Sequence, residues 1–264
     1  MKKRVLLLLL VFGLVLTFCS CGNEKKASGY SVVGSIGSEQ YLVAFRDGDK
    51  LRDIITAGMM VLSNDGTLSQ LSTRWLNDDR VTIPGSTEVE GWLQNQPQRV
   101  LILGYYAGAK PMCFEQDGSV TGFDAEMFTE ICNRLGWELH FQAIDRGNAS
   151  VELASGNVDC VAGGFGTGDD ISGLSTSPEY MDTKYVIITK ASSGIKRTGQ
   201  LKGKTLGTVG SSSMGKALEA DEKLVDRLGG LKVLNSEEEC FTALDAGLCD
   251  AILVTETCAD YYMR

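Results

Sequence analysis

From Arg99 onward the sequence alternates between short apolar runs and amphipathic segments, and this alternation limits the possible folds most strongly. Residues 100–103 (VLIL) predict a buried strand, and residues 137–141 alternate between apolar and polar as a second strand. The helix between them is expected to be capped by Asp124 and ended by Gly136. Its inward face is predicted to consist of Met127, Phe128, Ile131, Cys132 and Leu135. Strands and helices in alternation imply parallel sheets flanked by helices, an α/β fold.

Two segments of the chain repeat the same joint between a helix and a strand. Residues 152–164 (ELASGNVDCVAGG) and 243–255 (ALDAGLCDAILVT) both place a glycine after a helix and an aspartate before a buried strand. This echo favours two similar lobes, although unrelated joints of this kind are also common. The second lobe would hold a strand at 205–209 followed by a polar turn and a helix. Ser236 and Glu239 would form a capping box at its next helix.

The region before Arg99 is predicted to contain two helices and a long connection. Apolar residues at helical spacing indicate a helix over residues 51–62, stopped at Gly66, and a second one capped by Thr67. The second helix would bury Leu68, Leu71 and Trp75 on one face. Residues 79–98 hold two of the four prolines and no clean period, so we expect a loop with a short turn near Trp92.

The first residues read as an export signal. Three basic residues precede the apolar run 5–18, which is short for a membrane span and typical of a signal peptide. Cys21, between Ser20 and Gly22, resembles the acylated cysteine of a lipoprotein, with Cys19 as a competing site and an ordinary secretory signal as the alternative. The prediction is a lipoprotein signal peptide at 1–20 and a tether at 21–29.

Charge excludes one class of partner. The chain has a formal net charge of −9. Cleavage after residue 20 would remove three positive charges and no negative one, which leaves −12. An acidic export product without a basic run is a poor candidate for nucleic-acid binding. The rest of the chain is long enough for two modest lobes, each with its own core.

Six cysteines follow the signal, without the spacing of a metal site or a short disulfide framework. They are Cys113, Cys132, Cys160, Cys240, Cys249 and Cys258. Several lie at apolar positions, which favours thiols buried in the core. If a disulfide forms, Cys240, Cys249 and Cys258 are the expected partners because they are close in sequence. No metal or other cofactor is expected.

Several segments resemble the extracellular solute-binding proteins of amino-acid ABC transporters (family 3). The segments that carry the resemblance are VLILGYYAGAKPMCFEQDGSVTGFDAEMFTEICNRLG, VDCVAGGF, LSTSPEYMDTKYVIIT, LKGKTLGTVGSSS, GLCDAILVTETCADYYM and YSVVGSIGSEQYLVAFRDGD. Together they cover nearly all of the mature chain when its order is rotated. The resemblance implies a two-lobed periplasmic-binding-protein-like fold of type II, each lobe a mostly parallel sheet flanked by helices.

The order of the segments departs from the family. Residues 41–76 resemble the closing strand and helices of such proteins, yet they precede the segment that resembles the opening. The chain is therefore predicted to be circularly permuted, with lobe one formed by 40–90 and 99–187, and lobe two by 188–264 and 30–39. We expect a monomer. The alternative is a domain-swapped oligomer in which residues 30–90 complete a neighbour's lobe.

The resemblance also implies a ligand site in the cleft between the lobes, and here the match is incomplete. Relatives that bind α-amino acids hold the carboxylate with an arginine and the ammonium with an aspartate. Alignment places Ile171 and Thr255 at these two positions. Without both charges a free amino acid would lose several kcal/mol of binding, so the ligand's identity stays open.

Other residues remain as candidates for ligand contact. Tyr105, Tyr106 and Phe114 could stack on a ligand or simply pack in the core. Asp169 and Asp170 could meet a cation or lie solvated in a loop. Backbone turns and hydroxyl groups complete the candidate set: Gly163, Gly164, Phe165, Gly166, Ser211, Ser212, Ser213 and Thr255.

The resemblance implies a binding protein rather than an enzyme. Such a protein would be lipid-anchored at the extracytoplasmic face of the cell membrane and would deliver a small polar solute, such as an amino acid or a derivative, to an ABC permease. One alternative is a sensor or surface module with a decayed pocket. A dehydratase-like enzyme is another, but His140 is expected at the surface and nothing specifies Asp170 or Glu256 as an acid or base.

Overall fold

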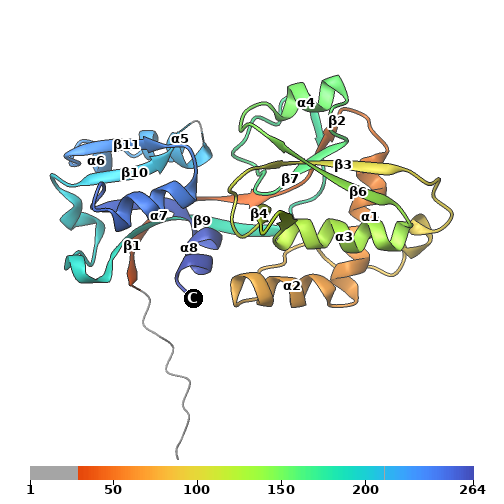
Figure 1. Ribbon diagram of the computed structural model, residues 1–264, viewed down its shortest axis with the longest axis horizontal. Coiled ribbons are helices and arrows are strands. Elements are labelled where there is room, and N and C mark those ends of the chain that lie inside the picture. Colours follow the sequence, from red (N-terminus) through yellow and green to blue (C-terminus); the bar gives the residue numbers. More distant parts are fainter. Residues whose placement is uncertain (1–28, 211) are drawn as a thin grey trace, which may run out of the picture.

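The computed structural model describes residues 29–210 and 212–264, which form two lobes joined by two long strands (Figure 1). The strands that join them are β1 (Tyr30–Tyr41) and β9 (Met181–Lys190), which pair antiparallel along their length. The predicted signal peptide, the lipidation site Cys21 and the candidate Ser211 lie outside the described residues. Within those residues, no helix has the length and apolar character needed to cross a membrane.

The sheet of lobe two has the strand order β1-β9-β12-β10-β11. Strand β10 (Thr205–Val209) lies parallel to both β11 (Gly230–Leu234) and β12 (Ala251–Thr255). Strand β9 is antiparallel to its two neighbours, so four of the five strands run in one direction. The mostly parallel sheet expected from the sequence is therefore present.

The sheet of lobe one has the order β6-β3-β7-β2-β8 and the same pattern of directions. Strand β3 (Val100–Tyr106) is parallel to β6 (Glu138–Ile144) and β7 (Cys160–Ala162). Strand β2 (Ala44–Arg46) is antiparallel to β7 and to β8 (Leu174–Thr176). The one reversed strand of lobe one thus comes from the segment that precedes Arg99.

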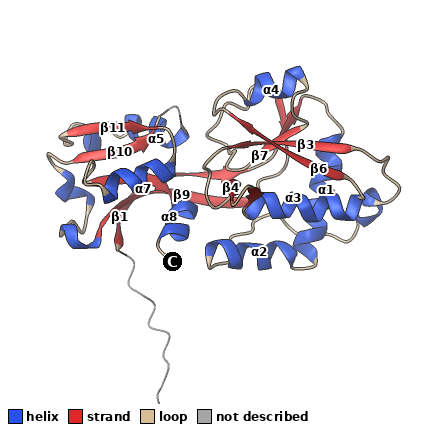
Figure 2. Cartoon of the chain, viewed as in Figure 1, coloured by secondary structure: helices blue, strands red, loops and turns tan. Residues whose placement is uncertain are grey.

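Helices cover both sheets (Figure 2). Lobe one carries α1 (Leu51–Asn64), α2 (Thr67–Leu76), α3 (Phe123–Leu135) and α4 (Ala149–Ser155), with a small hairpin of β4 (Phe114–Gln116) and β5 (Ser119–Thr121). Lobe two carries α5 (Ser213–Ala220), α6 (Glu222–Val225), α7 (Glu237–Asp245) and α8 (Glu256–Tyr262). Short 3-10 turns cover Glu90–Leu93, Ala191–Ser193 and Thr198–Leu201. Each lobe has a large hydrophobic core of its own.

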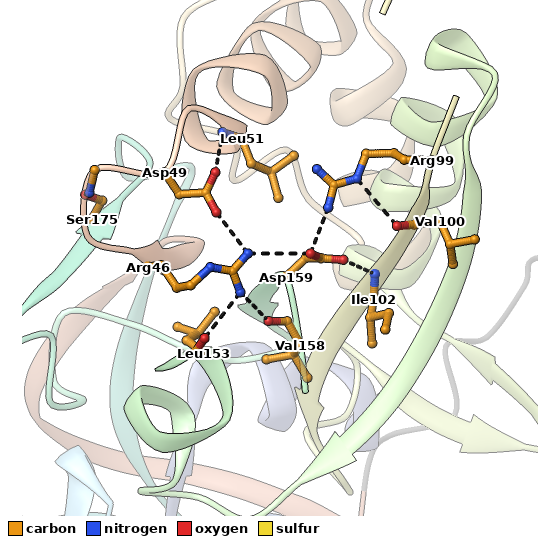
Figure 3. Close-up of polar contacts among 11 residues, drawn as sticks. Arg46, Asp49, Leu51, Arg99, Val100, Ile102, Leu153, Val158, Asp159 and Ser175 are labelled. Atoms are coloured by element: carbon orange, nitrogen blue, oxygen red, sulfur yellow. Dashed lines mark hydrogen bonds and ion pairs between the residues drawn. The ribbon is translucent and has the colours of Figure 1, made fainter. Parts of the chain in front are cut away.

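A charged cluster fastens the segment before Arg99 to the body of lobe one (Figure 3). Arg46 at the end of β2 donates hydrogen bonds to the carbonyls of Leu153 and Val158 at 3.2 and 3.0 Å, and lies 3.6 Å from Asp159. Asp159 also accepts from the backbone N–H of Ile102 at 2.8 Å and from Arg99 at 2.7 Å. One carboxylate therefore links β2, β3 and the entry to β7.

The predicted echo between the lobes is present in the structure. Asp159 precedes β7 and accepts from the N–H of Ile102 in β3, and Asp250 precedes β12 and accepts from the N–H of Thr205 in β10. Gly156 and Gly247 both adopt the left-handed backbone, with φ of 77° and 70°. The same local sequence thus makes the same joint in each lobe.

Three predicted helix caps need correction. Gly66 rather than Thr67 occupies the N-cap position of α2, and the N–H of Thr67 donates to Asp65. Gly122 precedes α3, while Asp124 lies buried in its first turn. Ser236 caps α7 as predicted, but Glu239 accepts from the N–H of Asn235 rather than from Ser236. The side chain of Thr67 donates to Asp65, and that of Asp124 accepts from Tyr180 and Gly163.

The six cysteines within the described residues are free and buried. This agrees with their interpretation as core thiols. The expected inward face of α3 is buried, and Gly136 ends this helix in the left-handed conformation with φ of 66°.

Candidate functional site

A cavity of about 150 Å³ lies between the lobes, at the carboxyl ends of the parallel strands of both sheets. From lobe one it is lined by 106–110 after β3, 144–146 after β6 and Gly164 after β7. From lobe two it is lined by 212–214 after β10, 235–237 after β11 and Thr255 at the end of β12. Loops at the carboxyl ends of parallel strands are where open α/β sheets bind ligands.

Arg146 is the main cation of this cavity. Its guanidinium lies over the ring of Tyr106, 4.3 Å from the ring centroid, and its Nη1 donates a long hydrogen bond of 3.4 Å to Asp169. A quarter of the side chain (25%) stays accessible. Burial disfavours the charge, but Asp169, Tyr106, Glu237 and Glu39 together raise the pKa of Arg146. The cation is therefore held at the cavity, and among the described residues its guanidinium makes one long hydrogen bond.

Glu39, near the end of β1, contributes a buried carboxyl group to the cavity. Only 4% of the residue is exposed, and its Oε2 accepts from the Ser213 hydroxyl at 2.8 Å. Burial raises its pKa to about 7, an effect that nearby Asp169 adds to and the Ser213 hydrogen bond opposes. A cation entering the cavity would find a carboxylate that lacks a full positive counterpart.

Glu237, in the first turn of α7, contributes a second carboxyl group. Its Oε1 accepts a short hydrogen bond from the backbone N–H of Thr255. Burial raises its pKa, while Thr255 and the charge of Arg146 lower it. The carboxylate thus lies at the end of β12, against Thr255, where the sequence comparison predicts an aspartate in relatives.

Cations and carboxylates in the cavity are unequal in number. Glu39, Asp145 and Glu237 line it together with Arg146 and Lys110. Lys110 is already paired with Glu238 of lobe two at 2.7 Å. The remaining cation, Arg146, faces Asp169, whose side chain is only 8% exposed. The site is therefore acidic and suits a ligand that carries positive charge.

Five of the predicted site residues line the cavity: Tyr106, Gly164, Ser212, Ser213 and Thr255. Their hydroxyl groups are partly committed to the protein itself. Ser212 caps α5 by accepting from the N–H of Gly215, and Thr255 caps α8 by accepting from the N–H of Cys258. Backbone groups and neighbouring charges therefore do more to shape this cavity than these hydroxyls do.

Other predicted residues lie apart from the cavity. Tyr105 packs edge-on against Phe141, and Phe114 packs edge-on against Trp75 and Tyr261. Phe165 is fully buried in a small core cluster, beside the Tyr106 ring.

Three loop residues complete the predicted set. Gly163 adopts a left-handed backbone with φ of 72°, and its N–H donates to Asp124. Gly166 donates its N–H to Asp169 at 2.9 Å. Asp170 is exposed, and the N–H of Ser172 and its hydroxyl lower its pKa. Asp169, rather than Asp170, is therefore the aspartate that faces the cavity's cation.

Sequence reasoning missed the charged groups of the site. Glu39, Arg146 and Glu237 lie in separate segments and carry no shared motif. One signal could have indicated Arg146: it follows β6, a strand that the sequence predicts from residues 137–141, at the edge where the parallel strands end. No strand was predicted before Glu237, which follows β11, and Glu39 lies within β1. Tyr41, which hydrogen-bonds Thr257 across the lobes at 2.9 Å, was missed in the same way.

No cluster of histidine, cysteine or acidic residues suited to a metal ion occurs in the part of the chain that the structure describes. His140 lies on the surface beside Glu138, as predicted.

Comparisons with known proteins point to one family. The bacterial extracellular solute-binding proteins, family 3, match residues 101–253. The arginine-binding extracellular protein ArtP of Bacillus subtilis is 26% identical over 179 residues, which cover 63% of this chain and 65% of ArtP. The probable amino-acid-binding protein YxeM of the same organism is 23% identical over 164 residues, 61% of either chain. The chain thus spans less than two thirds of the length of both relatives.

A solved structure gives the same indication. An ABC uptake transporter substrate-binding protein from Streptococcus pneumoniae with bound histidine superposes with a TM-score of 0.57 at 28% identity. The match covers 62% of this chain and 68% of that protein.

Proposed function

This chain belongs to the bacterial extracellular solute-binding proteins of family 3, and from that premise we propose that it captures an amino acid or amino-acid derivative in the cavity between its lobes. Members of this family bind solutes and are not enzymes. The observation that carries the proposal is the cavity itself, to which the strand ends of both lobes contribute. A ligand there would touch both lobes and favour the closed arrangement.

The size and charge of the cavity support an amino acid. A cavity needs about 10–15 Å³ to hold one water molecule. The cavity of about 150 Å³ could therefore hold on the order of ten water-sized groups, which suits a solute of roughly ten non-hydrogen atoms. ArtP is named for arginine, and the Streptococcus pneumoniae protein has histidine bound. Both amino acids are of about this size. Carboxylates and a cation together suit a molecule that carries both charges. Their presence also argues against a pocket that has decayed into a sensor module.

Delivery to an ABC permease follows from the family. We infer that the protein is anchored through an acylated Cys21 at the extracytoplasmic face of the cell membrane, with residues 22–29 as a polar tether. The sequence pattern of residues 1–21 supports this part of the proposal.

We also infer that the chain is a circular permutant of the family. The family match ends at residue 253 and begins at 101, after the segment that supplies β2, α1 and α2 to lobe one. Lobe one would then comprise 40–90 and 99–187, and lobe two 188–264 and 30–39. The position of β2 between β7 and β8 within one sheet supports this order.

The direct test is ligand-dependent stabilisation of the purified protein. Amino acids, their amides, polyamines and small peptides are screened by thermal unfolding and isothermal titration calorimetry. A ligand at 100 times its Kd stabilises the folded state by about 2.7 kcal/mol. We expect at least one amino acid to raise the Tm by several degrees. The absence of any shift at millimolar concentration across the screen would contradict the proposal.

A blocking variant shows whether binding occurs in this cavity. Ala107 is exposed and lines the cavity, so Ala107→Trp should fill it without disturbing the core. We expect this variant to keep its Tm in the absence of ligand and to lose binding at least tenfold. Ala154→Trp, at an exposed position of α4 outside the cavity, is the matched control and should bind as the unchanged protein does.

A further inference from the structure

Resting on the proposed function, we propose that Arg146 and Glu237 hold the carboxylate and the ammonium group of a zwitterionic α-amino acid in this cavity. They would take the place of the two charges that the sequence lacks at Ile171 and Thr255. Ile171 itself is 39% exposed, in the loop that follows Asp170, and does not line the cavity. The two recognition charges thus come from different strand ends than the alignment predicts.

Arg146 has the geometry of an anchor for a carboxylate. It follows β6 in lobe one, and among the described residues its guanidinium makes one long hydrogen bond, to Asp169 at 3.4 Å. The ring of Tyr106 supports one face of the guanidinium and fixes its plane. The planar group can donate two parallel N–H bonds, so its remaining donors can grip both oxygens of a carboxylate.

Glu237 has the position of an anchor for an ammonium group. It lies in lobe two and lines the cavity at the N-terminal turn of α7. Its Oε1 accepts from the N–H of Thr255, which holds the carboxylate at the place where the alignment predicts the missing aspartate. A carboxylate has about four acceptor sites, so Glu237 can also accept from a ligand.

The two groups line the same cavity. They come from different lobes, and the charge of each influences the ionisation of the other. A zwitterion between them would satisfy both charges at once and draw the lobes together. Glu39 would remain for a second positive charge, which favours amino acids with a basic side chain.

The test measures the affinity of each chemical group separately. L-arginine, L-argininamide, which lacks the carboxylate, and N-acetyl-L-arginine, which lacks the ammonium group, are titrated by calorimetry into the purified protein and its variants; L-histidine and its two derivatives serve as a second set. In the unchanged protein we expect each derivative to bind at least tenfold more weakly than its parent amino acid.

The variants assign each preference to a residue. Arg146→Gln should abolish the preference for the acid over the amide but keep the penalty for N-acetylation. Glu237→Gln should do the reverse, because its amide oxygen still accepts from Thr255. Arg146→Lys keeps the positive charge. This variant should bind L-arginine more weakly than the unchanged protein does, but it should retain the preference for the acid over the amide. Exposed Arg197→Gln and Glu222→Gln, the latter also in the first turn of a helix, should change neither preference.

Three results would overturn the inference and can be told apart. If Arg146→Gln and Glu237→Gln fold, shown by their Tm without ligand, and keep both preferences, the assignment is wrong while solute capture stands. If only solutes other than amino acids bind the unchanged protein, the ligand class is wrong. If no solute in the screen binds, the proposed function fails together with the inference. If Arg146→Gln does not fold, Arg146→Lys decides the first case: unchanged affinity for L-arginine would refute the anchor.

Discussion

Two buried carboxyl groups ionise near neutral pH in the folded protein. Burial raises the pKa of Glu39 from 4.5 to about 7 and that of Asp124 from 3.8 to about 7. Asp124 accepts hydrogen bonds from the Tyr180 hydroxyl at 2.7 Å and from the N–H of Gly163 at 2.8 Å, which moderate the effect of burial. Both groups therefore bind protons in the folded chain at a pH where the unfolded chain has released them.

This difference predicts that the ligand-free protein is more stable at pH 5 than at pH 8. Between about pH 4 and 7 the folded state holds more protons than the unfolded state, so stability falls as the pH rises. The extra stability is complete below the ordinary pKa values of the two groups, 4.5 for Glu39 and 3.8 for Asp124. It is lost as the pH rises through their raised pKa values of about 7. Denaturation in urea at several pH values measures it. A stability that rises steadily over this range would contradict the prediction.

Glu39→Gln separates the two contributions. Glutamine can still accept from Ser213 but does not titrate, so the fall in stability between pH 5 and 8 should become shallower. Glu222→Gln, at an exposed position, should leave the slope unchanged. If the slope of Glu39→Gln equals that of the unchanged protein, Glu39 ionises at an ordinary pKa.

At the scale of single elements, the joint before β7 depends on one aspartate. Asp159 accepts hydrogen bonds from Ile102 and Arg99 and forms an ion pair with Arg46 at 3.6 Å, and so joins three segments (Figure 3). Its removal takes an acceptor from the N–H of Ile102 and from Arg99, and an ion-pair partner from Arg46. Because Arg46 belongs to β2, the loss would also loosen the attachment of the segment before Arg99.

Asp159→Ala is therefore expected to destabilise the protein by about 3 kcal/mol, the upper end of the range for losing a hydrogen bond to a charged group and leaving its donor unsatisfied. The ion pairs themselves add little, because the side chains of Arg46 and Arg99 are 34% and 35% exposed. For a chain of this size the Tm should fall by roughly 6–12 °C. Asp159→Asn keeps an acceptor for the N–H of Ile102, so its loss of stability should be less than half of that of Asp159→Ala. Thermal unfolding measures both variants, and equal losses would show that the charge pairs, not the backbone hydrogen bond, hold the joint.

The joints and part of the cavity lining were predictable, but the charged groups of the site were not, for a physical reason. The glycine and aspartate of each joint act within a few residues or on the adjacent strand, so the local sequence is enough to predict these joints. Asp124 was expected to cap a helix because no local pattern reveals Tyr180, 56 residues away. Arg146 and Glu237 line one cavity only because the two lobes face each other. Local preference therefore fixes elements, while charges in a cavity depend on contacts between distant segments.

At the scale of the whole molecule, the beginning and end of the described chain lie close together. The ring of Phe241 contacts Tyr30 at 5.2 Å and Tyr262 at 4.2 Å between ring centroids. A few residues could therefore join Arg264 to Tyr30. The connection between α2 and β3 is exposed at Gln94 and Asn95, where opening the chain would cut no strand or helix.

A reordered chain tests the inferred permutation directly. It would run from Asn95 to Arg264, through a short glycine-serine linker, and then from Tyr30 to Gln94. If the natural order is a rotation of the family's order within one molecule, this chain should fold as a monomer, melt within a few degrees of the natural one and bind the same ligand. Light scattering, thermal unfolding and calorimetry measure these properties. A natural chain that is a dimer in solution, beside a monomeric reordered chain, would instead indicate that residues 30–90 complete a neighbour's lobe.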